Sequence, residues 1–79
     1  MTDIKDKVYE IVNKILLIDK EKITDSLSRK DIEDWDSMTH LIIISEIEQT
    51  FEIILSDDDI ADMNSVADIQ SIIGKYEIH

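Results

Sequence analysis

The feature that most limits how this chain can fold is its near lack of helix-breaking residues. Among 79 residues there is no proline and one glycine, Gly74. Long segments rich in Ile, Glu, Asp and Lys run without interruption, and apolar residues recur in them at helical spacing. Because a chain of this length builds only one small core, we expect residues 1–79 to form a single all-α domain, a four-helix bundle.

The first helix is predicted from apolar residues that share one arc at about 100° per residue. These residues are Ile4, Val8, Ile11, Val12, Ile15 and Leu16. Thr2 or Asp3 would cap its start. A long loop follows, over residues 18–36, and apolar side chains recurring every four to five residues would pin it to the core. They are Ile18, Ile23, Leu27 and Ile32.

Three more helices are predicted after the loop. The second covers about residues 37–52. A short third one, near residues 57–62, follows Ser56, and a fourth one follows Ser65 and runs toward Tyr76. Both serines begin a Ser-x-x-Asp sequence, the spacing of a capping box. The fourth helix would bury Val66, Ile69, Ile72, Ile73 and Tyr76.

Charge and composition exclude several classes of function. Nineteen acidic and eight basic residues give a formal net charge of −11. Such a charge repels nucleic acid and anionic lipid and favours basic protein surfaces. There is no apolar run of the roughly 20 residues that a membrane span requires, no evident signal sequence, and no cysteine. We therefore expect a cytoplasmic, monomeric protein that binds neither nucleic acid nor membrane.

The second helix has an unusual distribution of apolar residues. Its predicted core face consists of Ile43, Ile44, Ile47, Phe51 and Ile54, and the opposite side is mostly polar. Met38, Leu41 and Ile42 nevertheless fall on that outer side, close to Ser37. Exposed apolar residues rimmed by carboxylates are typical of a docking patch. The alternative is that the third helix or the long loop covers them.

Ser37 lies where the second helix should begin, after Asp34, Trp35 and Asp36. Serine is a favoured N-cap, which would by itself explain its presence. The same position also suits a phosphate, because a helix N-terminus presents unpaired N–H groups and the positive end of the dipole. Serine supplies a hydroxyl to which a phosphodiester can be attached.

The run Asp36-Ser37-Met38 and the segment that follows it, residues 39–51, resemble the phosphopantetheine attachment region of acyl carrier proteins. That family shows Asp-Ser-Leu, then an amphipathic helix that ends in an acidic stretch and an aromatic residue. The resemblance extends over essentially the whole chain, including the long loop and residues 53–60. It implies a non-catalytic carrier with a covalent 4'-phosphopantetheine arm that holds acyl groups as thioesters.

The resemblance also implies roles for single residues. Ser37 would accept phosphopantetheine from coenzyme A through a phosphopantetheinyl transferase, and Asp36 would assist that transfer. Met38 and Leu41 match apolar positions that contact partner enzymes. The matching acidic stretch would meet basic patches on acyl-transferring or acyl-activating enzymes; it consists of Glu48 and, more loosely, Glu46 and Glu52.

The sequence departs from the fatty-acid branch of that family at several positions. Met38 replaces the usual leucine, Trp35 stands where a small residue is more common, and His40 and Ile42 occupy places that are often polar or acidic. These features are closer to carriers of specialised pathways. An aminoacyl or peptidyl carrier of the same fold is the alternative within the family.

Three other functions are weaker interpretations. Ser37 and His40 lie three residues apart, but no Gly-rich elbow accompanies them, so we expect His40 to be a packing or capping residue rather than a catalytic base. The acidic run 57–59 with Asp62 fails the spacing of an EF-hand, so no metal site is predicted. An acidic adaptor domain with an unmodified Ser37 would share every other feature.

Overall fold

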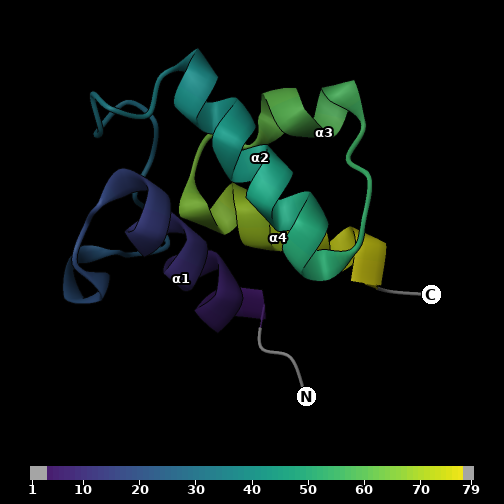
Figure 1. Cartoon of the computed structure of the whole chain (residues 1–79), viewed down its shortest axis with the longest axis horizontal. Coiled ribbons are helices and arrows are strands. Elements are labelled where there is room, and N and C mark those ends of the chain that lie inside the picture. The colour runs from purple at the N-terminus through teal and green to yellow at the C-terminus, as the bar shows by residue number, and fades with distance from the viewer. Residues whose placement is uncertain (1–3, 78–79) are drawn as a thin grey trace.

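The computed structural model describes residues 4–77 and is shown in Figure 1. Four α-helices and no strand lie in that range, together with one short 3₁₀ turn, η1. Their bounds are α1 Ile4–Leu16, η1 Lys20–Lys22, α2 Ser37–Phe51, α3 Asp57–Asp62 and α4 Val66–Glu77. This confirms the predicted all-α fold with a short third helix and a long loop before α2. The predicted caps Thr2 and Asp3 lie outside the described residues.

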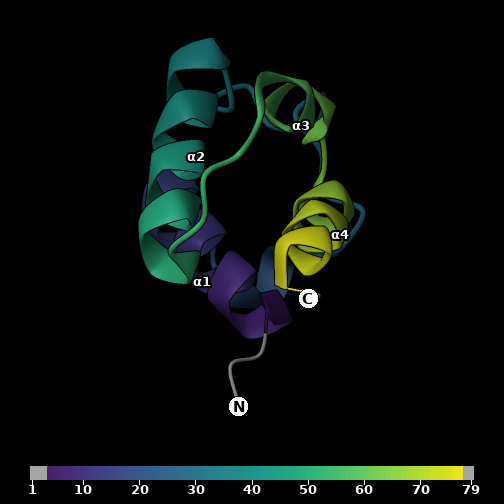
Figure 2. The same ribbon diagram turned by 90° about the vertical axis from the view of Figure 1, so that its right-hand side faces the viewer.

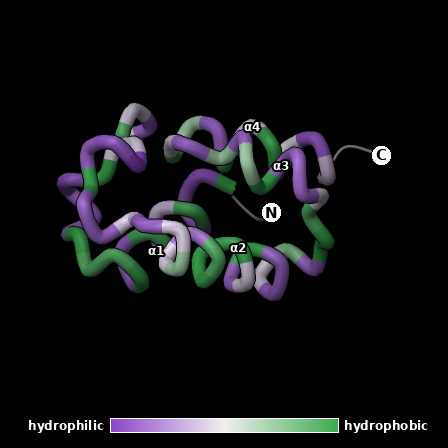
Figure 3. Tube along the Cα trace, turned by 90° about the horizontal axis from the view of Figure 1, so that it is seen from above, coloured by the Kyte–Doolittle hydropathy of each residue, from purple (hydrophilic) through white to green (hydrophobic). Residues whose placement is uncertain are grey.

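The three longer helices enclose the core. α1 packs against both α2 and α4, and Figure 2 shows α3 above α4, across from the start of α2. Hydrophilic and hydrophobic stretches alternate along the helices in Figure 3, as expected of helices that bury one face. No helix among residues 4–77 is both long and apolar enough to span a membrane. The buried core residues are Val8, Ile11, Val12, Leu16, Ile23, Trp35, Ile43, Ile44, Ile47, Leu55, Met63, Val66, Ile69, Ile72 and Ile73.

The predicted core face of α2 is confirmed except at its end. Ile43, Ile44 and Ile47 are buried and Phe51 is partly buried, but Ile54 is 86% exposed. The prediction for Ile54 was wrong because α2 stops at Phe51. Glu52 adopts a left-handed conformation, with φ 56°, and its N–H bonds to the carbonyl of Glu48. Helical periodicity therefore no longer applies at residue 54.

The long loop is held by the start of α4 as well as by the core. The N–H groups of Val66 and Ala67 donate to the carbonyls of Leu27 and Asp25, each at 2.9 Å. The first N–H groups of a helix have no partner within the helix, so the loop satisfies two of them. Its predicted anchors are buried or packed on the core: Ile18, Ile23, Leu27 and Ile32.

The side chain of Asp25 also joins the loop to α1 and α4. Its Oδ1 accepts hydrogen bonds from the Gln70 amide and the Tyr9 hydroxyl, both at 2.8 Å. These bonds lower the pKa of the Asp25 carboxyl because they stabilise its charged form, and the bond from Gln70 has the larger effect. The loop is therefore fixed by directional contacts as well as by apolar packing.

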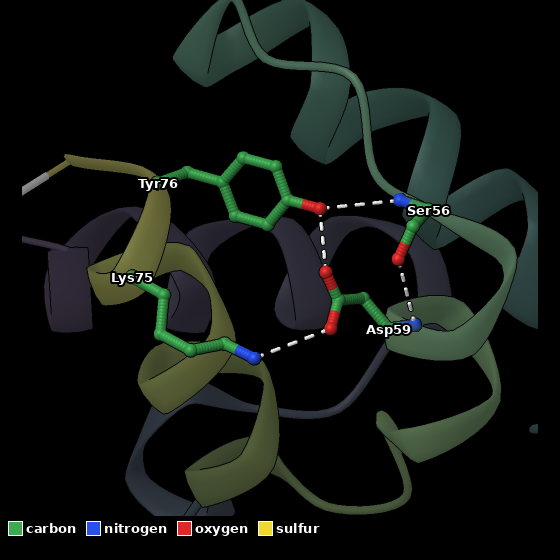
Figure 4. A network of polar contacts seen from close by, with 4 residues as sticks. All are labelled: Ser56, Asp59, Lys75 and Tyr76. Carbon is green, nitrogen blue, oxygen red and sulfur yellow. Dashed lines mark hydrogen bonds and ion pairs between the residues drawn. The ribbon is translucent and has the colours of Figure 1, made fainter.

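Both predicted serine caps are present. Ser56 Oγ accepts from the N–H of Asp59 at 3.2 Å, and Ser65 Oγ accepts from the N–H of Asp68 at 3.1 Å. Figure 4 shows how the first cap is tied to α4: the Tyr76 hydroxyl donates to the Asp59 carboxylate and accepts from the N–H of Ser56. The Tyr76 bond, followed by that from Lys75, lowers the pKa of Asp59. The network holds α3 against the end of α4.

Gly74 offers a test of this packing. It lies inside α4, and a Cβ built on it meets no atom within 4 Å. Glycine costs helix stability because its backbone is freer in the unfolded chain. We expect Gly74→Ala to raise the free energy of unfolding by about 0.5–1 kcal/mol. Urea unfolding followed by circular dichroism measures it. A lower free energy with an unchanged m-value would contradict the described packing of α4.

Candidate functional site

Ser37 is the first residue of α2 and is exposed. It is not the N-cap, which was one of the two roles that its position allowed. The cap is Asp36, whose backbone is extended and whose Oδ1 accepts from the N–H of Thr39 at 2.8 Å. The carbonyl of Asp36 accepts from the N–H of His40, also at 2.8 Å, so the helical bonding begins at Asp36. Within residues 4–77, the Ser37 hydroxyl forms no hydrogen bond.

Asp36 is held in its ionised form by the cap. Hydrogen bonds from Thr39 lower the pKa of the Asp36 carboxyl, and the bond from the backbone N–H has the largest effect. A negative charge at this position also complements the positive end of the α2 dipole. Sequence reasoning missed this role, although aspartate ranks with serine as an N-cap and Thr39 lies three residues further on.

Trp35 and His40 form a buried polar link next to Ser37. Their exposed fractions are 2% and 4%. The indole Nε1–H of Trp35 lies 3.0 Å from Nδ1 of His40, and Nε2 of His40 lies 2.9 Å from the carbonyl oxygen of Ile60 in α3. An indole N–H only donates, so Nδ1 must accept, and Nε2 then carries the proton that is donated to Ile60. This arrangement requires a neutral imidazole.

Burial favours the same neutral state of His40. Desolvation lowers the pKa of the imidazole, and the nearby charge of Arg29 lowers it further, against the opposing effect of the Ile60 carbonyl. Both ring nitrogens are engaged in hydrogen bonds, so neither is placed to take a proton from the Ser37 hydroxyl. The geometry agrees with the prediction of a packing histidine and opposes a serine–histidine catalytic pair.

The apolar residues near Ser37 are exposed. Met38, Leu41 and Ile42 have exposed fractions of 73%, 60% and 51%. Neither α3 nor the long loop covers them, which decides between the two alternatives that the sequence left open. We refer to these three residues as the α2 apolar patch. They follow Ser37 within the first turn and a half of α2.

The three glutamates predicted to bind partners differ in their surroundings. Glu46 Oε1 lies 2.6 Å from Nζ of Lys14 in α1. Glu48 Oε2 accepts from the N–H of Leu55 at 2.9 Å, so this side chain helps hold the connection between α2 and α3. Glu52 is exposed at the end of α2. Two of the three therefore have structural contacts, and their part in partner binding stays a prediction.

Negative charge is concentrated in the part of the chain that contains these residues. Residues 31–74 include twelve Asp and Glu residues and no Lys or Arg, whereas residues 1–30 include six acidic and seven basic ones. Within the acidic run at residues 57–59, the carboxylate of Asp59 accepts hydrogen bonds from Tyr76 and Lys75. Among residues 4–77, no group of three or more potential ligands is arranged to hold a metal ion.

The chain is similar in sequence to proteins of known type. The family model described as "Phosphopantetheine attachment site" matches residues 6–71. An acyl carrier protein of Buchnera aphidicola subsp. Schizaphis graminum (strain Sg) is 36% identical over 66 residues, which make up 84% of each chain. The range matched by the family model contains the long loop, α2 and α3, and with them Ser37.

The state of His40 gives a test by pH. Because its pKa is lower in the folded protein, the unfolded chain takes up the proton first as the pH falls. The stabilisation from neutral His40 is therefore complete above a pH of about 6.5 and is lost progressively below it. His40→Gln keeps an acceptor and a donor but does not titrate. We expect the free energy of unfolding of the wild type, relative to that of His40→Gln, to decrease below about pH 6.5.

Urea unfolding of both proteins from about pH 8 to about pH 5 measures this difference. The carboxylates and the large net charge are common to both proteins, so their effects cancel in the comparison. A difference that does not depend on pH would show that His40 is not held neutral by the fold.

Proposed function

Because this chain belongs to the acyl carrier protein family, which carries phosphopantetheine, we propose that Ser37 is the attachment point of the arm and that the protein carries acyl or related groups as thioesters. Proteins of this family are carriers rather than catalysts. The observation that carries the proposal is the Ser37 hydroxyl, which is exposed at the first residue of α2 and has no hydrogen-bond partner among residues 4–77.

The residues present fit the attachment reaction. The oxygen of Ser37 would form a bond to the phosphorus that bears the pantetheine chain of coenzyme A. The bond from that phosphorus to the adenosine bisphosphate part breaks, and the hydroxyl proton passes to a base of the phosphopantetheinyl transferase. Asp36 assists by capping α2, which keeps Ser37 at the start of the helix. N–H groups of a helix N-terminus favour the phosphodiester charge.

The arm supplies a thiol that this cysteine-free chain lacks, and the thiol holds the cargo as a thioester. The chain's own residues present the attachment point and bind partners. The α2 apolar patch gives an orienting contact beside Ser37, and the acidic character of residues 31–74 attracts basic surfaces. Charge of this kind speeds encounter and is weakened by salt, which suits a carrier that must dissociate after each transfer.

The pathway is also part of the proposal. Trp35 and His40 depart from the fatty-acid branch of the family, and in this fold they are buried together as a bonded pair. This supports a carrier for a specialised pathway, with an aminoacyl or peptidyl carrier as the alternative. We place the protein in the cytoplasm as a monomeric domain spanning residues 1–79, with acyl-transferring or acyl-activating enzymes as partners.

Mass spectrometry tests the attachment point directly. Incubation with coenzyme A and a broad-specificity transferase should add the mass of one phosphopantetheine to the wild type and none to Ser37→Ala. Ser45→Ala is the matched control, because Ser45 is also an exposed serine of α2. It should be modified as the wild type is. A folded wild type that gains no mass, beside an active transferase control, would contradict the proposal.

The α2 apolar patch is tested by a second pair of variants. Leu41→Ala removes exposed apolar surface beside Ser37, and Ile54→Ala removes exposed apolar surface beyond the other end of α2. We expect Leu41→Ala to lower kcat/KM for modification by about fivefold or more. Ile54→Ala should leave it unchanged. Equal effects of the two substitutions would show that the patch is not a contact surface for the transferase.

A further inference from the structure

The hydrogen-bond link from Trp35 through His40 to Ile60 has no role in the attachment reaction described above, yet Trp35 and His40 lie on either side of Ser37 in the chain. Both side chains are buried, and in the described part of the chain no buried side-chain nitrogen or oxygen lacks a partner. Polar groups placed in so small a core are costly unless they are satisfied. An apolar pair would fill the same space without that requirement, so the link calls for a separate explanation.

The link fixes the Asp36–Ser37 turn from both sides. Trp35 immediately precedes the turn, and its own N–H donates to the carbonyl of Ile32 at 3.1 Å. His40 follows the turn, and its N–H donates to the carbonyl of Asp36. The side-chain bond between Trp35 and His40 closes this short segment into a ring that contains Ser37.

The far side of the imidazole extends the link to α3. Nε2 of His40 donates to the carbonyl of Ile60, and α3 is in turn held against α4 through Asp59 and Tyr76. The backbone that carries Ser37 is therefore connected by hydrogen bonds to the far end of the bundle. Loss of the Nε2 bond would remove this hydrogen-bonded connection between the first turn of α2 and α3, and loss of the Nδ1 bond would release Trp35 from it.

We propose that Trp35 and His40 are positioning residues, which hold the Asp36–Ser37 turn in place against α3 and so set the rate at which Ser37 is modified. The inference rests on the proposed function of Ser37. Transfer to a hydroxyl demands accurate placement, since a displacement of about 1 Å can cost on the order of 100-fold in rate. The pair acts through the backbone of the turn and does not contact the transferred group.

Protonation of His40 breaks the link. A proton on Nδ1 would face the Nε1–H of Trp35, so two donors would meet and their hydrogen bond would be lost. The groups that face His40 are Trp35 at the end of the loop, the neutral Ile60 carbonyl in α3, and the cationic Arg29 in the loop, whose charge opposes protonation. Positioning of Ser37 is therefore expected to weaken in acid.

The test compares the kinetics of modification among folded variants. Trp35→Phe keeps an aromatic ring but removes the indole N–H, and His40→Ala removes both bonds of the imidazole. Each should lower kcat/KM for phosphopantetheine addition by about tenfold, mainly through kcat. Ile73→Val in the core of α4 is the control for general destabilisation; it should stay within about twofold of the wild type. If His40→Ala does not fold, Trp35→Phe still decides the question.

His40→Gln distinguishes a positioning role from a purely structural one, because only a positioning role predicts that the modification rate is rescued and becomes less dependent on pH. Its amide can accept from Trp35 and donate to Ile60, so it should restore most of the rate lost in His40→Ala. The ratio of wild-type to His40→Gln rates should decrease in acid, as the pH falls through the pKa of His40, which burial holds below its usual value of about 6.5. The transferase is common to both reactions, so its own pH dependence cancels from the ratio.

NMR checks the geometry independently of the transferase. The indole N–H of Trp35 should exchange slowly with solvent in the wild type and faster in His40→Ala, because burial and the bond to Nδ1 protect it. Equal exchange in the two proteins would overturn the inference. So would a modified wild type whose Trp35→Phe and His40→Ala rates match Ile73→Val. A wild type that is not modified at all would contradict the function of Ser37 and this inference together.

Discussion

The docking of the long loop onto the start of α4 is the contact on which the rest of the structure depends. The N–H groups of Val66 and Ala67 need acceptors, and the carbonyls of Leu27 and Asp25 supply them. With the loop held there, its last residues reach the core, where Trp35 is buried and bonds to His40. A chain with no disulfide and a small core thus orders a loop of this length through directional bonds. The position of Ser37 at the start of α2 follows from that order.

Mutual repulsion among negative charges is the main electrostatic feature of residues 31–74. Residues 31–74 contain no Lys or Arg, and two ion pairs seen within residues 4–77, Lys14 with Glu46 and Lys75 with Asp59, bring their lysines from outside this segment. The lysines of both pairs are exposed, and pairs so open to solvent contribute little to stability, so most of the mutual repulsion remains. That repulsion destabilises the isolated protein, and the basic partner surface proposed above would relieve it. This supports the proposal that the acidic segment serves the binding of basic partners.

Periodicity and capping chemistry were enough to predict the helices, and the limits of that prediction have physical causes. The apolar arcs of α1 and α4 and the caps at Ser56 and Ser65 follow from local sequence, and the structure confirms them. Ile54 was misplaced because the left-handed residue that ends α2 interrupts the helical period. The partner of His40 was not predictable, since its acceptor lies 20 residues away in α3. Exposure of the α2 apolar patch likewise depends on where α3 and the loop settle.

The division of roles between Asp36 and Ser37 would allow the proposed modification of Ser37 without loss of the helix cap. If Ser37 were the N-cap, the oxygen that accepts the helix N–H would also be the one esterified, and movement of the attached arm would disturb the cap. Asp36 takes the N–H of Thr39 instead, with a carboxylate whose pKa the same bond lowers. Esterification of Ser37 then removes no hydrogen bond from the described fold. The helix can remain capped while its first side chain carries a long, mobile group.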